Sequence, residues 1–91
     1  MMTAQEFKTY VYQVAQEIGV SQHISSIHLR KMKTKIASCS TKGRITFDTS
    51  LLEYTDQQKI KEIIIHELLH LRYKNHGKMF KMMLNYYINK L

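Results

Sequence analysis

The stretch from residue 66 to residue 70 constrains the fold of this chain more than any other feature. It reads His66-Glu67-Leu68-Leu69-His70, so two histidines stand four residues apart with a glutamate directly after the first. Four residues of helix turn through about 400°, which places the two imidazoles on one face within roughly 40° of each other. That geometry suits two nitrogen ligands of one zinc ion, at about 2.0–2.1 Å each. The pattern, which is typical of zinc sites on helices, therefore predicts a helix that carries metal ligands.

The residues around this motif predict a central, buried helix. Thr55-Asp56 can cap its start, and the apolar pattern extends to about Tyr73 or Lys74. The middle of the segment is apolar almost all round, with Ile63, Ile64, Ile65, Leu68, Leu69 and Leu71. A helix that is hydrophobic on every side is expected to be buried. Two histidines and a glutamate inside it are costly unless something satisfies them, and a metal ion would do so.

A metal site needs a third protein ligand, and one strong candidate follows the motif. Downstream of Glu67 the sequence has no aspartate, glutamate or cysteine, and its one further histidine is His76 after His70. On a continuous helix, six residues turn through about 600°, so these two histidines would point roughly 240° apart. The helix must therefore end first, and Asn75 and Gly77 are predicted to make the turn because both tolerate a left-handed backbone. We predict that zinc is the cofactor and that its ligands are His66, His70 and His76.

Glu67 is the predicted catalytic residue of this site. Three histidines leave a fourth coordination position for water, and Glu67 lies one step round the helix, where it can reach that water without binding the metal. It would take a proton from the water and later pass it to the leaving nitrogen, as a general base and then a general acid. The hydrogen-bond donor for a developing oxyanion stays open among Tyr54, Arg72, Tyr73, Tyr86 and Tyr87.

The other helices are predicted at the two ends of the chain. Thr3 and Glu6 form a capping-box pattern, and Gly19 is expected to end the N-terminal helix in the left-handed conformation. A C-terminal amphipathic helix begins near Lys78, and its methionines are expected to be adaptable core residues.

Between the first two helices, the pattern favours strands. Ile27 and Leu29 alternate with polar residues, 36–40 is a weaker strand, and 44–47 is a third, reached through a turn at 41–43. We interpret these as a small, mainly antiparallel three-stranded sheet. The fold class is therefore α+β, with a single domain over residues 1–91.

Charge and cysteine content indicate which partners and which cellular compartment to expect for the protein. Fourteen lysines and arginines against seven acids give a formal net charge of +7, which attracts nucleic acid, acidic proteins or anionic surfaces. The basic residues that could form such a surface are Arg30, Lys31, Lys33, Lys35, Lys42 and Arg44. Cys39 stands alone, so no internal disulfide can form, and neither a signal peptide nor a membrane span is evident. A cytoplasmic protein without membrane contact is expected, with Cys39, His23 and His28 outside the metal site.

Two segments resemble the YgjP-like predicted zinc metallopeptidases. Residues 32–47, which contain Ser38-Cys39-Ser40 and Gly43, look like the family's strand segment R-W-G-S-C-S-x-x-G-x-I-x-L-N. Residues 65–71, followed by 75–80, are similar to its motifs H-E-L-x-H-L and N-H-S-x-x-F. The resemblance covers roughly residues 27 to 82. Ile36 and Ala37 stand where tryptophan and glycine are usual, and Gly77 replaces a serine, departures that bear on the shape of the cleft.

The resemblance implies a zincin-like fold with the sheet above the active-site helix. It implies that His66, His70 and His76 are zinc ligands and that Glu67 is the general base. It also implies kinship with SprT-like and Wss-type proteases, some of which act on proteins attached to DNA. The strand with Ser38-Cys39-Ser40 would lie beside the cleft, where an extended substrate can pair with it.

Three functions follow as hypotheses. The leading one is a small zinc-dependent metallopeptidase that acts on a protein or peptide, with DNA or a DNA-bound protein as a further partner of the basic surface. The second is a metal-dependent endoribonuclease like the YbeY family, which places three histidines as H-x(3)-H-x(5)-H but usually has glycine where Glu67 stands. The third is a non-catalytic, zinc-stabilised module that binds nucleic acid. The oligomeric state stays open.

Overall fold

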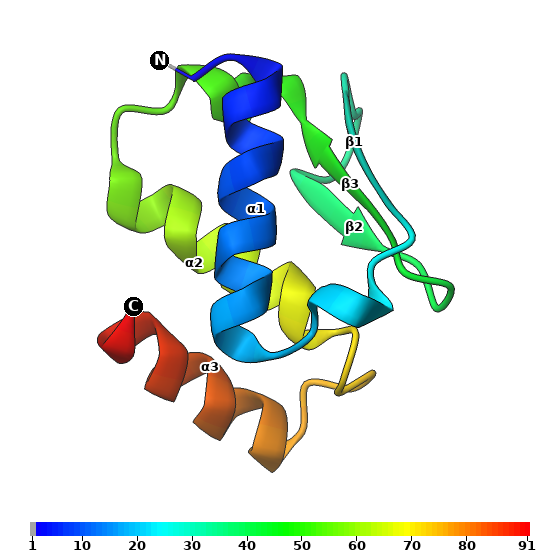
Figure 1. Ribbon diagram of the computed structural model, residues 1–91, viewed down its shortest axis with the longest axis vertical. Helices are drawn as coiled ribbons and strands as arrows, with labels where there is room; N and C mark the ends of the chain where they lie inside the picture. Colours follow the sequence, from blue (N-terminus) through cyan, green and yellow to red (C-terminus); the bar gives the residue numbers. More distant parts are fainter. Residues whose placement is uncertain (1) are drawn as a thin grey trace.

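The protein is described by a computed structural model that covers residues 2–91. Over these residues the elements are α1 (Ala4–Ile18), β1 (Ser26–Arg30), β2 (Ala37–Cys39), β3 (Arg44–Asp48), α2 (Gln57–Leu69) and α3 (Lys78–Lys90). Two short 3-10 helices, η1 (Ser21–His23) and η2 (Thr49–Glu53), lie between them. The sheet forms one side of the molecule and the three helices the other (Figure 1). The predicted α+β class is confirmed.

The N-terminal helix has the predicted ends. The Thr3 hydroxyl accepts a hydrogen bond from the backbone N–H of Glu6, and the Glu6 carboxylate accepts one from the backbone N–H of Thr3. Gly19 ends α1 with a φ of 88°, a left-handed conformation that glycine adopts without a steric penalty. The buried face of α1 packs against β3, where the rings of Phe7 and Phe47 meet edge to face with centroids 5.1 Å apart.

The sheet has the three predicted strands, but its pairing is mixed rather than mainly antiparallel. Its order is β1-β3-β2, so β3 lies in the middle. β2 and β3 form an antiparallel hairpin, whereas β1 pairs with β3 in parallel, with Ile27 opposite Ile45. The alternation of apolar residues shows which face of a strand is buried but does not identify its partner. The segment 31–36 reverses the chain between β1 and β2, and β3 is inserted between them.

The helix that carries the motif lies in the middle of the molecule, as its apolar composition predicts. α2 is capped by Asp56, whose carboxylate accepts a hydrogen bond from the backbone N–H of Lys59. It contacts α1, β2 and α3. Its buried residues are Ile60, Ile64, Ile65, Leu68 and Leu69.

α2 ends earlier than the sequence predicted, at Leu69 instead of Tyr73 or Lys74. The backbone N–H groups of His70, Leu71 and Arg72 each donate to the carbonyl three residues before, at 3.0–3.2 Å. These bonds tighten the last turn and satisfy the free carbonyls. The predicted left-handed turn at Asn75 or Gly77 was wrong, because among residues 2–91 only Gly19 and Gly43 have a positive φ.

The C-terminal helix begins at Lys78 as predicted, but two of its methionines do not fill the core. Met79 is 52% exposed and Met82 is 54% exposed, whereas Met83 is half-buried. Phe80 is the buried residue of α3. α3 lies at the edge of the molecule (Figure 1), so much of its surface faces solvent. None of the helices in residues 2–91 has the length and apolar content needed to cross a bilayer.

Candidate metal centre

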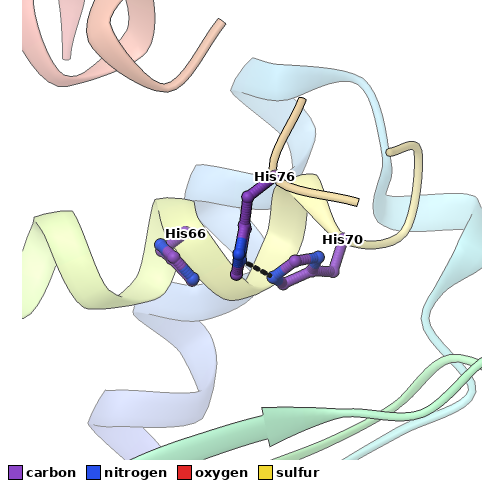
Figure 2. A group of neighbouring side chains, drawn as sticks. All are labelled: His66, His70 and His76. Atoms are coloured by element: carbon purple, nitrogen blue, oxygen red, sulfur yellow. Dashed lines mark hydrogen bonds between the residues drawn. The ribbon is translucent and has the colours of Figure 1, made fainter. Parts of the chain in front are cut away.

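His76, which would point away from His66 and His70 on a continuous helix, converges with them in the structure. His66 projects from α2 and His70 from its last turn, while His76 returns over them from the loop before α3 (Figure 2). The Nε2 atoms of His70 and His76 are 2.9 Å apart. The ligand atoms of all three side chains lie within 4.8 Å of one another. The early end of α2 makes this possible, because it frees residues 74–77 to fold back.

The donor set fits a metal ion. Around a tetrahedral ion with bonds of 2.0–2.1 Å, ligand nitrogens stand about 3.3 Å apart, so small side-chain adjustments would bring the three rings into place. Nδ1 of His70 lies 3.2 Å from the backbone carbonyl of Tyr73, to which it can donate a hydrogen bond. That bond holds the ring with Nε2 free toward the other histidines, and such a carbonyl partner is usual for a metal-binding histidine.

Phe80 forms the wall behind the histidines, a role that sequence reasoning did not assign. Its ring is 2% exposed, and its centroid lies 5.1 Å from that of His66 and 4.8 Å from those of His70 and His76. It stacks on His70 and meets the other two at steeper angles. Its spacing of four residues after His76 was the available signal, because the first turn of α3 carries Phe80 back toward the ring cluster.

Glu67 lies beside the cluster in the same cleft. Its carboxyl is half-buried, and this burial raises its pKa, although the positive charges of Lys35 and His76 act in the opposite direction. A carboxyl with a raised pKa takes up a proton more readily, which is what a group that accepts and returns a proton needs.

Burial also governs the charge of His66. It lowers the pKa of this imidazole, and the neighbouring charges of His70 and His76 lower it further. The ring is therefore held neutral at physiological pH, and the neutral form is the one that binds a metal.

The cleft itself has a volume of about 800 Å³. β2 and the hairpin turn form one wall, and His66, Glu67, His70 and His76 lie along the other. Cys39 lines the cleft, where burial and the charge of Glu67 raise the pKa of its thiol to about 11. A protonated thiol is a poor metal ligand, and the metal cluster does not include it.

The remaining candidates of the sequence analysis lie elsewhere. His23 is exposed at the rim of the cleft, and His28 is hydrogen-bonded to the Ser26 hydroxyl at 3.0 Å. Of the side chains considered for the oxyanion, Arg72 donates to the Gly19 carbonyl at 3.2 Å. None of the following five lines the cleft: Tyr54, Arg72, Tyr73, Tyr86 and Tyr87.

This fold and site define a class: a small α+β protein whose cleft combines three converging histidines with a half-buried glutamate. The chain belongs to the YgjP-like metallopeptidase domain family, whose model matches residues 2–91. The resemblance seen in the sequence is thus confirmed, and the family supports a metal-dependent peptidase.

Similar proteins match most of the length of this chain. The chain is 34% identical over 95 residues to an uncharacterized protein of Methanocaldococcus jannaschii, covering 98% of this chain and 86% of that protein. The crystal structure of the metallopeptidase zymogen jannalysin, from the same organism, has a TM-score of 0.79 at 32% identity, covering 89% of this chain and 80% of that one. The metallopeptidase zymogen abylysin of Pyrococcus abyssi has a TM-score of 0.69 at 27% identity, covering 85% and 75%.

Proposed function

We propose that this protein is a zinc-dependent peptidase in which His66, His70 and His76 hold the ion and Glu67 is the general base. One observation carries the proposal: the ligand atoms of the three histidines lie within 4.8 Å of one another, and Glu67 lines the same cleft. Zinc is favoured over harder cations because the protein offers three imidazole nitrogens.

The residues divide the chemistry between them. The ion, when bound, supplies Lewis acidity toward water and toward the carbonyl of the scissile peptide bond. Glu67 removes a proton from the attacking water and delivers it to the leaving amide nitrogen, and its raised pKa suits both transfers. Phe80 holds the three imidazoles in place through ring contacts.

The edge of the sheet offers a binding surface for the substrate. β2 pairs with β3 on one side alone, and Ala37, Ser38 and Cys39 line the cleft. An extended polypeptide can add to such an edge through backbone hydrogen bonds. This supports an unfolded protein or a peptide as the substrate.

The other two hypotheses are not favoured. Membership of a metallopeptidase family speaks against both a ribonuclease and a non-catalytic module. DNA as an accessory partner of the basic surface, and a cytoplasmic location, remain predictions.

The decisive experiment compares the wild type with Glu67→Gln after zinc loading. We expect the wild type to cleave an unstructured protein such as casein, and the variant to be slower by about 10²–10⁴-fold with an unchanged zinc content. Glu53→Gln, at an exposed position in η2, is the matched control and should keep full activity. Equal rates for the wild type and Glu67→Gln would contradict the mechanism.

The assay should also allow for latency, since jannalysin and abylysin are described as zymogens. The chain is therefore tested both as purified and after brief trypsin treatment followed by trypsin inhibitor. A folded, zinc-loaded protein that cleaves nothing in either form would refute the proposed peptidase.

A further inference from the structure

Two cavities of different character meet at the proposed catalytic residues. The cleft of about 800 Å³ is adjoined by a smaller pocket of about 330 Å³, and His66 and Glu67 line both. A polypeptide lying over these two residues therefore has one part in the cleft and another at the pocket. The two linings then determine which side chains are accepted on either side of the bond that is cut.

The cleft is electropositive. Lys35, Lys42 and Lys74 line it, all three exposed. Glu67 is its one carboxylate among the described residues, and its half-burial leaves the solvent-facing part of the cleft to the lysines. A concave surface lined by one sign of charge focuses the electrostatic field and attracts the opposite charge. The cleft therefore favours aspartate or glutamate side chains.

The smaller pocket is largely apolar. Ile36, Ile63, Leu84 and Ile88 line it, together with Lys59 and Glu62, whose charges are opposite. Its volume is near the lower end of ligand pockets, about 300 Å³, which suits a single side chain. Burying a large apolar side chain there removes it from water, which favours its binding.

The sheet edge connects the two cavities. Ile36 lines the smaller pocket, whereas Ala37, Ser38 and Cys39, which follow directly, line the cleft. One extended segment paired along this edge would reach both cavities with neighbouring residues.

We infer that the preferred substrate is an unfolded polypeptide with acidic residues on one side of the scissile bond and a large apolar residue on the other. The inference rests on the proposed peptidase function and specifies its substrate class. The lysines bind the acidic part, and the pocket at Ile36 binds the apolar side chain.

The acidic preference is tested with quenched fluorescent peptides of one length. One carries glutamates and a leucine around the cut, and the others replace the glutamates by glutamine or lysine. For the wild type we expect kcat/KM to fall about tenfold from glutamate to lysine, less at high salt. The double variant Lys42→Glu/Lys74→Glu should reduce kcat/KM for the glutamate peptide about tenfold more than it reduces kcat/KM for the glutamine peptide. Lys81→Glu, on the exposed side of α3, is the control and should change neither.

The apolar preference is tested by replacing the leucine with serine. The wild type should lose about tenfold in kcat/KM, since even one methylene in an apolar pocket changes kcat/KM by roughly 10–200-fold. Ile36→Glu should weaken this discrimination, and its 36% exposure makes the change compatible with folding. Met82→Glu, which is exposed on α3 and lines neither cavity, is the matched control.

A binding measurement separates this inference from the peptidase proposal. Fluorescence anisotropy with zinc-loaded Glu67→Gln should show tighter binding of the glutamate–leucine peptide than of the lysine or serine forms. Equal cleavage and equal binding of all peptides would overturn the inference while the peptidase stands. If no peptide is cleaved but the glutamate–leucine peptide still binds more tightly than the others, the proposed peptidase activity alone would be overturned. An RNA oligonucleotide serves as the competing ligand. The inference would also be overturned if the RNA bound more tightly than the acidic peptide and if Lys42→Glu/Lys74→Glu abolished this RNA binding.

Discussion

Burial shifts three titratable side chains of the cleft toward their uncharged forms. It raises the pKa of Glu67, lowers that of His66 and raises that of Cys39 to about 11. The reason is the same in each case, because a charged group loses hydration when it leaves water. The consequences differ: a neutral imidazole can bind a metal, the carboxyl gains affinity for a proton, and the thiol is kept inert.

The raised pKa of Glu67 predicts a stability effect. In the folded protein the pKa of Glu67 lies above the unfolded value of 4.5. The contribution of this carboxyl to folding stability is therefore fully present below pH 4.5 and is lost as the pH rises through the pKa of the folded protein. At pH 7 the burial of this carboxyl therefore destabilises the metal-free protein, and Glu67→Gln should raise its Tm by a few degrees. Thermal unfolding with chelator at pH 7 and pH 4 measures this, and the difference from the wild type should vanish at pH 4. A lower Tm for the variant at pH 7 would contradict the prediction.

The thiol of Cys39 should be slow to react. With a pKa of about 11, the thiolate is scarce at pH 8, and alkylation by iodoacetamide should be about a hundredfold slower than for an unperturbed thiol. Glu67→Gln should speed the reaction, since the charge of Glu67 contributes to the shift. Mass spectrometry of timed samples gives the rates, with the urea-unfolded protein as reference. Labelling at the unfolded rate would contradict the described position of Cys39.

At the scale of elements, the site depends on how α2 ends and α3 begins. α2 presents His66, and its tightened last turn presents His70. The first turn of α3 inserts Phe80 against the rings and leaves His76 just before the helix. Two helices and the loop between them thus make up the whole cluster, so packing between α2 and α3 sets its geometry.

Substitutions of Phe80 can measure how far the packing between α2 and α3 sets the geometry of the histidine cluster. Phe80→Ala should cost about 3–5 kcal/mol of unfolding free energy, as expected for a fully buried phenylalanine. Phe80→Leu should fold and yet bind zinc about tenfold more weakly, because the imidazoles lose their supporting ring. Urea unfolding and zinc titration give the two quantities. Met79→Ala, at the neighbouring exposed position, should change stability by less than about 0.5 kcal/mol. Unaltered zinc affinity in Phe80→Leu would show that the ring does not position the ligands.

At the scale of the whole molecule, the candidate site links the central helix to an element at the edge. α3 buries Phe80 fully and leaves Met79 and Met82 largely exposed, so its attachment rests on few buried side chains. A chain of 91 residues also has a modest core. An ion held by His66, His70 and His76 would therefore contribute to the stability of the entire domain.

Zinc should raise the stability by mass action. At a free concentration of 100 times Kd, the gain is about 2.7 kcal/mol, which is roughly 10–20 °C in Tm for a domain of this size. Calorimetry with and without zinc measures the shift, and a chelator should reverse it. His76→Ala should abolish it, whereas His28→Ala, on β1 and outside the cluster, should retain it. A shift that survives in His76→Ala would place the ion elsewhere.

Local chemistry explains what could be predicted before the structure. Thr3, Glu6 and Gly19 mark the ends of α1 because capping is decided by residues three or four apart. His66 and His70 share a face through helix geometry alone, and the lack of other ligand types downstream singled out His76. The limits of the second strand and the early end of α2 were less predictable, because competing backbone hydrogen bonds decide them by small energies.

By itself, the sequence determined the α+β class, the two caps of α1, the N-cap of α2 and the choice of three histidines as candidate ligands, since periodicity, capping and ligand chemistry act between near neighbours along the chain. The tertiary structure alone decided that β3 lies between β1 and β2 and that Phe80 backs the histidines. It also decided that Lys35, Lys42 and Lys74 line the cleft while Ile36, Ile63 and Ile88 line the adjoining pocket. Those features arise from contacts between residues far apart in the chain. Such contacts depend on how whole elements pack, which no local pattern specifies.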